Sequence, residues 1–246
     1  MNRRLFVASS LSALGLTACG PVKESLTNGP FRAALLSTEP LNRAVIGTRG
    51  LAREYKDSDV DRQFRVNGLD TPSDSAYVRL LNDQFRAYRL VVSGLVERDQ
   101  SLSLAELRAA GTRTQITRHD CVEGWSAIGK WSGVPLATVL AMARPRANAR
   151  YCVFRCFDVD QSGQHYYESL DLHQAAHPQT ILALDLNDRP LDADHGAPVR
   201  LKIPTQLGYK SAKWISRIEL VADTAPIAGG RGGYWEDQGY EWYAGI

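Results

Sequence analysis

The chain has 246 residues, of which 44% are hydrophobic and 23% are charged, and its formal net charge is +2. This is the ordinary composition of a globular protein with one large or two small domains. The small net charge favours neither a nucleic acid nor an acidic partner. The sequence also lacks a run of 18 apolar residues, about the length that a stop-transfer helix needs.

The N-terminus has the pattern of a bacterial export signal. Arg3 and Arg4 precede an apolar stretch at residues 5–16, which is too short to span a bilayer. The letters L-T-A-C, ending at Cys19, resemble a lipobox, in which the cysteine is lipidated after cleavage. An ordinary secretory signal with a chance cysteine is the alternative. We predict a twin-arginine/lipoprotein signal peptide at residues 1–18 and a periplasmic protein anchored to the membrane by lipid.

Residues 19–61 predict a tether that ends in a packing segment, because scattered prolines give way to a charged run. The domain proper is expected at residues 62–246, and its elements are short. Ser103 and Glu106 form a capping-box pattern at the start of one helix. We expect helices at 105–110, at 171–176 and from about Pro135, and strands at 89–94, 112–117, 151–158, 180–186, 199–203 and 214–221.

Short strands therefore predominate, and no βαβ period is present. This pattern predicts an α+β fold with mixed β-sheets and short helices.

One stretch, residues 118–136, concentrates chemistry-bearing side chains, with the letters R-H-D-C-V-E-G-W-S-A-I-G-K-W-S-G-V-P-L. Cys121 directly follows His119 and Asp120 and lies two residues before Glu123. The preceding alternation predicts that Cys121 lies where a strand gives way to irregular backbone, a common position for reactive side chains. A buried, inert cysteine is the alternative.

Three motifs in register resemble the molybdenum-cofactor domain of the sulfite oxidase family. They are C-V-E-G-W with W-S-G-V-P-L, then H-G-A-P-V-R-L-K-I-P, then G-Y-K-S-A-K-W-I. The likeness covers residues 64–246, and its C-V-E-G-W form resembles the branch of bacterial periplasmic methionine-sulfoxide reductases. The resemblance implies a sulfite-oxidase-type molybdopterin-binding domain in which Cys121 is the protein ligand of molybdenum. It also implies that Glu123 lies near the metal and serves proton delivery, whereas a backbone-capping role is the alternative.

The same resemblance implies a set of residues around the pterin. They are Asn67, Cys156, His195, Arg200, Ser211 and Lys213. An arginine offers a bidentate fork to phosphate, and a histidine donates from either ring nitrogen. Without the family, the R-L-K-I-P segment at 200–204 is an ordinary strand with exposed cations.

The remaining cysteines do not form a disulfide or a zinc pair by spacing. Cys152 and Cys156 lie on one predicted strand, roughly 13 Å apart at ~3.3 Å per residue. A disulfide needs Cα atoms within about 7 Å. We expect Cys152 in the core.

The C-terminal glycine- and aromatic-rich segment, residues 229–243, allows two interpretations. A single R-G-G copy is too little for an RNA-binding tail, and no lysine follows to form a phosphate loop. The segment either packs as structure or lines a substrate funnel.

The function predicted from these residues is oxygen-atom transfer by a molybdenum-molybdopterin oxidoreductase acting on a small-molecule substrate. Reduction of a sulfoxide is favoured over oxidation of sulfite, because no arginine cluster beyond Arg113 and Arg118 lies near Cys121 in sequence. A cofactor-free lipoprotein binding module on the same fold is the second class. The sequence has no haem-attachment motif, so electrons are expected from a separate partner, with a membrane haem protein as one candidate.

Overall fold

The computed structural model describes residues 33, 37, 39–41, 50–66, 68 and 71–246. The predicted signal peptide, Cys19 and Asn67 lie outside the described residues. The chain divides into two compact units, Met1–Gly47 and Thr48–Ile246. In the first unit, the amide of Ser37 donates to the carbonyl of Ala33 over 3.0 Å. All that follows concerns the second unit.

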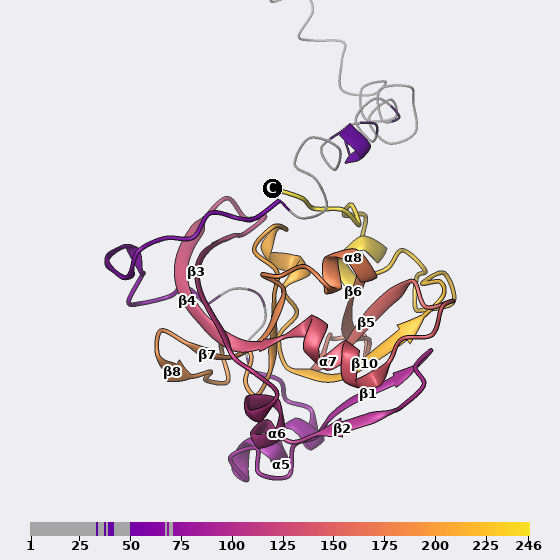
Figure 1. Cartoon of the computed structure of the whole chain (residues 1–246), viewed down its shortest axis with the longest axis horizontal. Helices are drawn as coiled ribbons and strands as arrows, with labels where there is room; N and C mark the ends of the chain where they lie inside the picture. The colour runs from indigo at the N-terminus through magenta and orange to yellow at the C-terminus, as the bar shows by residue number, and fades with distance from the viewer. Residues whose placement is uncertain (1–32, 34–36, 38, 42–49, 67, 69–70) are drawn as a thin grey trace, which may run out of the picture. The chain divides into compact units, whose positions relative to one another are not determined.

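Two β-sheets of mixed strand lengths organise the second unit (Figure 1). The first sheet has the order β2 (Gln100–Leu102), β1 (Leu90–Gly94), β10 (Ile215–Val221), β5 (Tyr151–Val159) and β6 (His165–Asp171). Within it, β1 and β10 are parallel and the other neighbours are antiparallel. The second sheet has the order β3 (Arg113–Asp120), β4 (Ser126–Pro135), β7 (Ile181–Leu186) and β8 (Arg189–Pro190), and β9 (Arg200–Lys202) also pairs with β7.

The helices are short, with at most eight residues each. They are η1 (Asp57–Asp59), α5 (Ser75–Asn82), α6 (Leu104–Ala109), α7 (Leu136–Ala143), α8 (Leu172–Ala175), η2 (Gly208–Lys210) and α9 (Tyr234–Asp237). The capping box predicted for α6 is confirmed, since Ser103 accepts from the Glu106 amide and Glu106 binds back to the Ser103 amide. Mixed sheets with short helices confirm the predicted α+β class. Within the described residues, no helix is both long and apolar enough to cross a bilayer.

Alternation along β7 divides the buried side chains into two cores. Leu182 and Leu184 belong to the larger core, with side chains from β1, β5, β10 and α7. Ile181 and Ala183 belong to a smaller core around Trp131. Because successive side chains of a strand point to opposite faces, β7 separates these two cores.

The second strand of the β3–β4 hairpin, β4, is the main element that the sequence did not predict. Only the turn at 121–125 is irregular, and β4 then pairs with β3 over eight positions from Arg113↔Gly133 to Asp120↔Ser126. Glycines and a proline lower the strand propensity of β4. Close packing requires a glycine at position 133, because a Cβ there would collide with the carbonyl of Leu182.

Residues 50–61, assigned from sequence to the N-terminal segment, pack along this hairpin. The amide of Tyr55 donates to the carbonyl of Ile116 over 2.9 Å, and that of Asp61 donates to Ile128 over 2.9 Å. The side chain of Gln179 binds both the amide and the carbonyl of Ala52. These bonds tie residues 52–61 to the second compact unit, which begins at Thr48.

Candidate cofactor and active site

The turn of the β3–β4 hairpin presents Cys121. The Cys121 amide donates to the carbonyl of Trp125 over 2.9 Å, and the Gly124 amide donates to the Cys121 carbonyl over 3.0 Å. Gly124 has a φ of +86°, a conformation that side chains disfavour. The turn is therefore fixed by its backbone, and a rigid strand pair positions the thiol as the sequence predicted.

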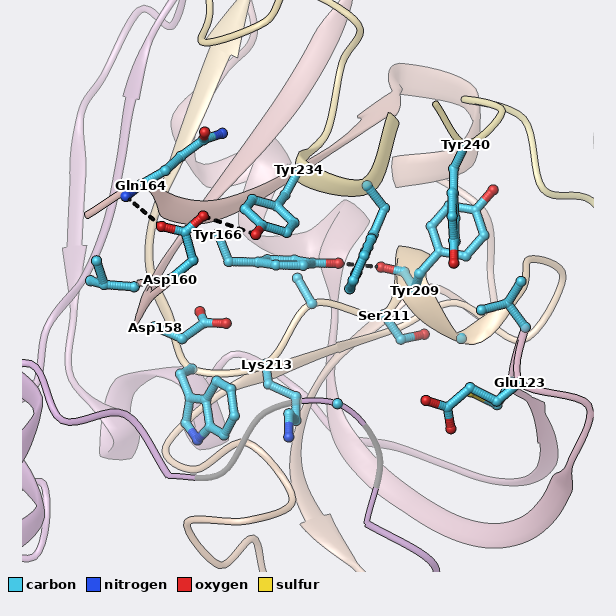
Figure 2. A pocket seen from close by; sticks show the side chains of 18 of the residues that line it. Glu123, Asp158, Asp160, Gln164, Tyr166, Tyr209, Ser211, Lys213, Tyr234 and Tyr240 are labelled. Carbon is cyan, nitrogen blue, oxygen red and sulfur yellow. Dashed lines mark hydrogen bonds between the residues drawn. The ribbon is translucent and has the colours of Figure 1, made fainter. Parts of the chain in front are cut away.

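Cys121 opens into a cavity of about 320 Å³ (Figure 2). The predicted site residues Glu123, Ser211 and Lys213 line the same cavity, so the structure brings four of them together. The cavity wall also includes the end of β5, part of η2 and the aromatic residues around α9. Gly68, which follows the undescribed Asn67, is part of the lining.

Burial raises the pKa of the Cys121 thiol, with a smaller opposing effect from its hydrogen bond to the backbone of Glu123. A thiol with a raised pKa is a poor nucleophile at neutral pH, which argues against covalent cysteine catalysis. A metal cation removes the proton from a coordinating thiol outright. The raised pKa thus disfavours a free nucleophile, and the role of Cys121 as a metal ligand stays a prediction.

Glu123 lies at the exposed edge of the cavity, and Trp125 holds its side chain. The Trp125 Nε1 donates to Glu123 Oε2 over 2.9 Å. The guanidinium of Arg65 lies over the Trp125 ring, 4.9 Å from the ring centre. The role of Glu123 in proton delivery stays a prediction.

A cluster of buried basic groups lies behind the cysteine. His119 is 2% exposed, and burial lowers its pKa well below the usual range, with further lowering by the charges of Lys202, Arg200 and Lys213. Burial, with a smaller effect of the neighbouring Arg200 charge, lowers the pKa of Lys202 to about 7. Burial also lowers the pKa of Arg200 to about 10. Both cations face the Trp131 ring, at 5.2 Å for Arg200 and 5.6 Å for Lys202.

These basic groups fit an anionic cofactor. Like charges buried together are unfavourable unless an opposite charge accompanies them, because burial penalises each charged form. Among the described residues, the buried Nε2 of His119 has no hydrogen-bond partner. A thiol beside buried cations and an unpartnered nitrogen matches what a metal, its sulfur ligands and a phosphate require.

Arg200 and Lys202 correct one sequence expectation. Without the family resemblance, the segment at 200–204 was expected to be a strand with exposed cations. In the structure, Arg200 is 0% exposed and Lys202 is 1% exposed. The strand β9 lies against β7 inside the molecule, so both side chains are enclosed. Lys202 was missed as a site residue, although alternation places it on the face of Arg200.

His195 and Cys156 lie apart from the Cys121 cavity. His195 lines a second cavity, and its ring nitrogens bind Asp192 Oδ1 at 2.7 Å and the Phe64 carbonyl at 3.0 Å. Its own carbonyl accepts from Arg200 Nη1 over 3.2 Å, which ties this loop to the buried cations. The Cys156 side chain belongs to the larger core. Their proposed pterin contacts stay predictions.

Cys152 and Cys156 do not form a disulfide, as their spacing predicted. Cys121, Cys152 and Cys156 are free thiols, and Cys152 is fully buried in the larger core. Burial raises the pKa of Cys152 to about 12, so this thiol stays protonated and unreactive.

The C-terminal segment lines the cavity with aromatic rings. Tyr234, Trp235 and Tyr240 are in the wall, and Trp235 stacks on Tyr240 with ring centres 5.3 Å apart. Tyr166 from β6 also lines the cavity, and its hydroxyl donates to the carbonyl of Tyr209 over 2.7 Å (Figure 2). Of the two interpretations left open for this segment, the structure favours the one in which it lines a funnel.

A fully buried ion cluster fixes α9 and these aromatic residues. Lys210 Nζ donates to Glu168 Oε1 over 2.5 Å and to Glu236 Oε1 over 2.7 Å, and all three side chains are 0% exposed. Burial raises the pKa of Glu168 well above its usual range, although the charge of Lys210 opposes this.

Comparison with known proteins gives concordant matches. The family described as "Oxidoreductase molybdopterin binding domain" matches residues 77–227. The chain is 38% identical over 250 residues to a putative protein-methionine-sulfoxide reductase subunit, YedZ1, of Azospira oryzae, across 99% of this chain and 87% of that protein. It is 32% identical over 237 residues to the protein-methionine-sulfoxide reductase catalytic subunit MsrP of Xanthomonas axonopodis pv. citri, across 89% of this chain and 70% of that protein.

A solved structure adds a likeness of fold. The sulfane dehydrogenase SoxCD of Paracoccus pantotrophus superposes with a TM-score of 0.50 and 22% sequence identity, over 56% of this chain and 39% of that chain. At this identity the likeness concerns the fold alone.

Proposed function

Because this chain belongs to the family of oxidoreductases with a molybdopterin-binding domain, we propose that it reduces a sulfoxide-type substrate by oxygen-atom transfer. The two relatives named as methionine-sulfoxide reductase subunits support this choice of substrate class. When bound, molybdenum-molybdopterin supplies two-electron chemistry and a site that accepts the oxygen atom. The chain itself supplies the Cys121 thiolate and the buried cations Arg200 and Lys202.

The charge of the cavity wall is the observation that carries this proposal. Among the described lining residues, Lys213 has the one cationic side chain, whereas Glu123, Asp158 and Asp160 are carboxyls. Sulfite is a dianion and needs a cationic pocket, because charge complementarity decides which anions enter a cleft. A sulfoxide is neutral and polar, and its apolar substituents suit the aromatic wall.

The two arginines near Cys121 in sequence, Arg113 and Arg118, do not add positive charge to the cavity wall. Arg118 is half-exposed and pairs with Asp120 at 2.7 Å. Arg113 pairs with Glu54 at 2.6 Å on the far end of β3. Both are engaged by carboxylates outside the cavity wall.

Steady-state assays on cofactor-loaded protein test the substrate class. With a reduced viologen dye as electron donor, we expect turnover of an alkyl or aryl sulfoxide. With sulfite and an artificial electron acceptor, we expect a rate at least about tenfold lower, because Lys213 is the one cationic side chain among the described lining residues. Faster oxidation of sulfite than reduction of any sulfoxide would contradict the proposal.

We also propose that the protein works in the periplasm, anchored by lipid on Cys19 and reduced by a separate membrane partner. The paired arginines and the L-T-A-C sequence support this location. The Cys19→Ala variant is expected to move from membranes to the soluble periplasmic fraction, because the acyl chains provide the membrane affinity. Fractionation of cells that produce wild type and variant measures this, and unchanged membrane association would rule out the lipid anchor.

A further inference from the structure

Asp158, a residue that the sequence did not single out, lies in the wall of the Cys121 cavity. It is the penultimate residue of β5 and is 5% exposed. Its carboxyl points into the cavity, between Lys213 and Tyr166 (Figure 2). Among the described residues, its Oδ1 atom has no hydrogen-bond partner. A buried polar atom without a partner is costly and calls for a functional or structural explanation.

The surroundings of Asp158 favour the protonated form of its carboxyl. Burial raises its pKa to about 7, against smaller lowering by a hydrogen bond to its own backbone and by the charge of Lys213. The other titratable groups that interact with it are the thiol of Cys156 and the phenols of Tyr166 and Tyr234. Burial raises the pKa of each of these three groups, so they are uncharged at neutral pH.

Asp160, two residues further along, is kept in the opposite state. The hydroxyl of Ser162 donates to it over 2.7 Å. The Gln164 amide and the Tyr234 hydroxyl each donate to it over 2.9 Å (Figure 2). These bonds, led by that of Ser162, lower its pKa to about 2. Two carboxyls in one cavity whose environments separate their pKa values indicate an acid and a permanent anion.

We propose that Asp158 is the internal acid that gives a proton to the substrate oxygen during sulfoxide reduction, an inference that rests on the proposed function. The sulfur–oxygen bond breaks, sulfur keeps an electron pair as the sulfide, and oxygen leaves as water after accepting two protons. The two electrons come from the reduced cofactor, which the electron donor replenishes. Asp158 supplies one proton, and solvent at the cavity mouth supplies the second and reprotonates the carboxylate.

Glu123 is less suited to this step. Its side chain is exposed and already accepts from Trp125 Nε1. A group that faces water loses the protection that keeps a carboxyl protonated near neutral pH. Asp158 is enclosed and keeps an oxygen free to face a ligand.

The first test follows the melting temperature of the cofactor-loaded protein with pH, which does not depend on turnover. The Asp158 carboxyl binds its proton more tightly in the folded state than in the unfolded state, so its contribution to stability is lost as pH rises from about 3.8 to about 7. Asp158→Asn lacks this titration. Its melting temperature relative to wild type should therefore increase across that window and level off above it. Asp99→Asn, the same change at an exposed loop, should run parallel to wild type.

The second test is the pH profile of kcat/KM for a sulfoxide with reduced viologen, with rates referred to bound molybdenum. For wild type, kcat/KM should fall about tenfold per pH unit above neutrality, as a required acid ionises, which gives the profile a falling limb on its alkaline side. Asp158→Asn should be about 100-fold slower at pH 6 and lack that limb, because a positioned acid contributes about 10²–10⁴ in rate. Asp158→Glu, which keeps an acid, should retain a falling limb.

The outcomes separate the two hypotheses. A flat wild-type profile, or an Asp158→Asn variant with the wild-type rate and limb, overturns the role of Asp158 while sulfoxide reduction stands. A wild-type protein that carries molybdenum but reduces no sulfoxide overturns the proposed function itself, and the role of Asp158 with it.

Discussion

Replacing Cys121 by serine is expected to abolish turnover almost completely while leaving a folded protein. Cys121 is partly exposed in a turn that its backbone holds, so the side chain contributes little to packing. A serine hydroxyl lacks the soft, covalent donation with which a thiolate tunes a metal. We therefore expect loss of the sulfur-to-metal charge-transfer absorption and a decrease in kcat of at least about 10³-fold, while the buried cations still hold the pterin.

Cys152→Ser provides the matched control, because it makes the same chemical change in the larger core. Burying an unsatisfied hydroxyl there is expected to cost about 1–3 kcal/mol of stability. Its absorption spectrum and its rate per bound molybdenum should match those of wild type. If Cys121→Ser keeps the wild-type spectrum and rate, Cys121 is not the ligand.

Replacing Lys210 by methionine is expected to have the largest effect on stability. Lys210 donates to Glu168 and Glu236 inside the fold, and removing one partner of a buried pair costs about 3–5 kcal/mol. Without the ammonium, the charge that opposes the effect of burial on Glu168 is gone, so the pKa of Glu168 in the folded state exceeds its value in the unfolded state. The variant should therefore lose stability progressively as pH rises through neutrality, and the deficit should be smallest in acid.

Urea denaturation at pH 5 and pH 8 measures this effect. The same background with Glu168→Gln and Glu236→Gln should recover much of the loss, since neutral amides do not need the cation. A single Lys210→Met variant as stable as wild type at pH 8 would contradict the account of this cluster. Because α9 carries Tyr234 and Trp235, we also expect the destabilised variant to lose affinity for substrate.

Local signals were sufficient to predict much of the fold. The alternation before Cys121 predicted β3, and the Ser103–Glu106 capping box predicted the start of α6. In each case the determining contacts lie within a few residues of one another. The three motifs in register predicted the cofactor-binding domain, and the match of residues 77–227 to the molybdopterin-binding family confirms it.

Features set by contacts between distant segments were not predictable in this way. The strand β4 was missed because Gly129 and Gly133 lower its propensity, yet Gly133 is needed where β7 passes close by. The burial of Lys202 depends on β9 lying against β7. Lys210 is buried because Glu168 and Glu236 converge on it from β6 and α9.

Asp158 illustrates the same limit at the site. In sequence it is one of several acidic residues near the end of a strand. Its chemistry comes from enclosure by Tyr166, Tyr234 and the segment around Lys213, which belong to other parts of the chain. A site that combines side chains from several elements has no single sequence signature.

We propose that the chain binds molybdenum through its pterin, with Cys121 and a buried cationic cluster as the binding groups. The most direct measurement is the molybdenum and pterin content of wild-type protein purified from a host that makes the cofactor. We predict about one molybdenum and one pterin per chain. Correctly folded protein from such a host that contains neither would contradict the account.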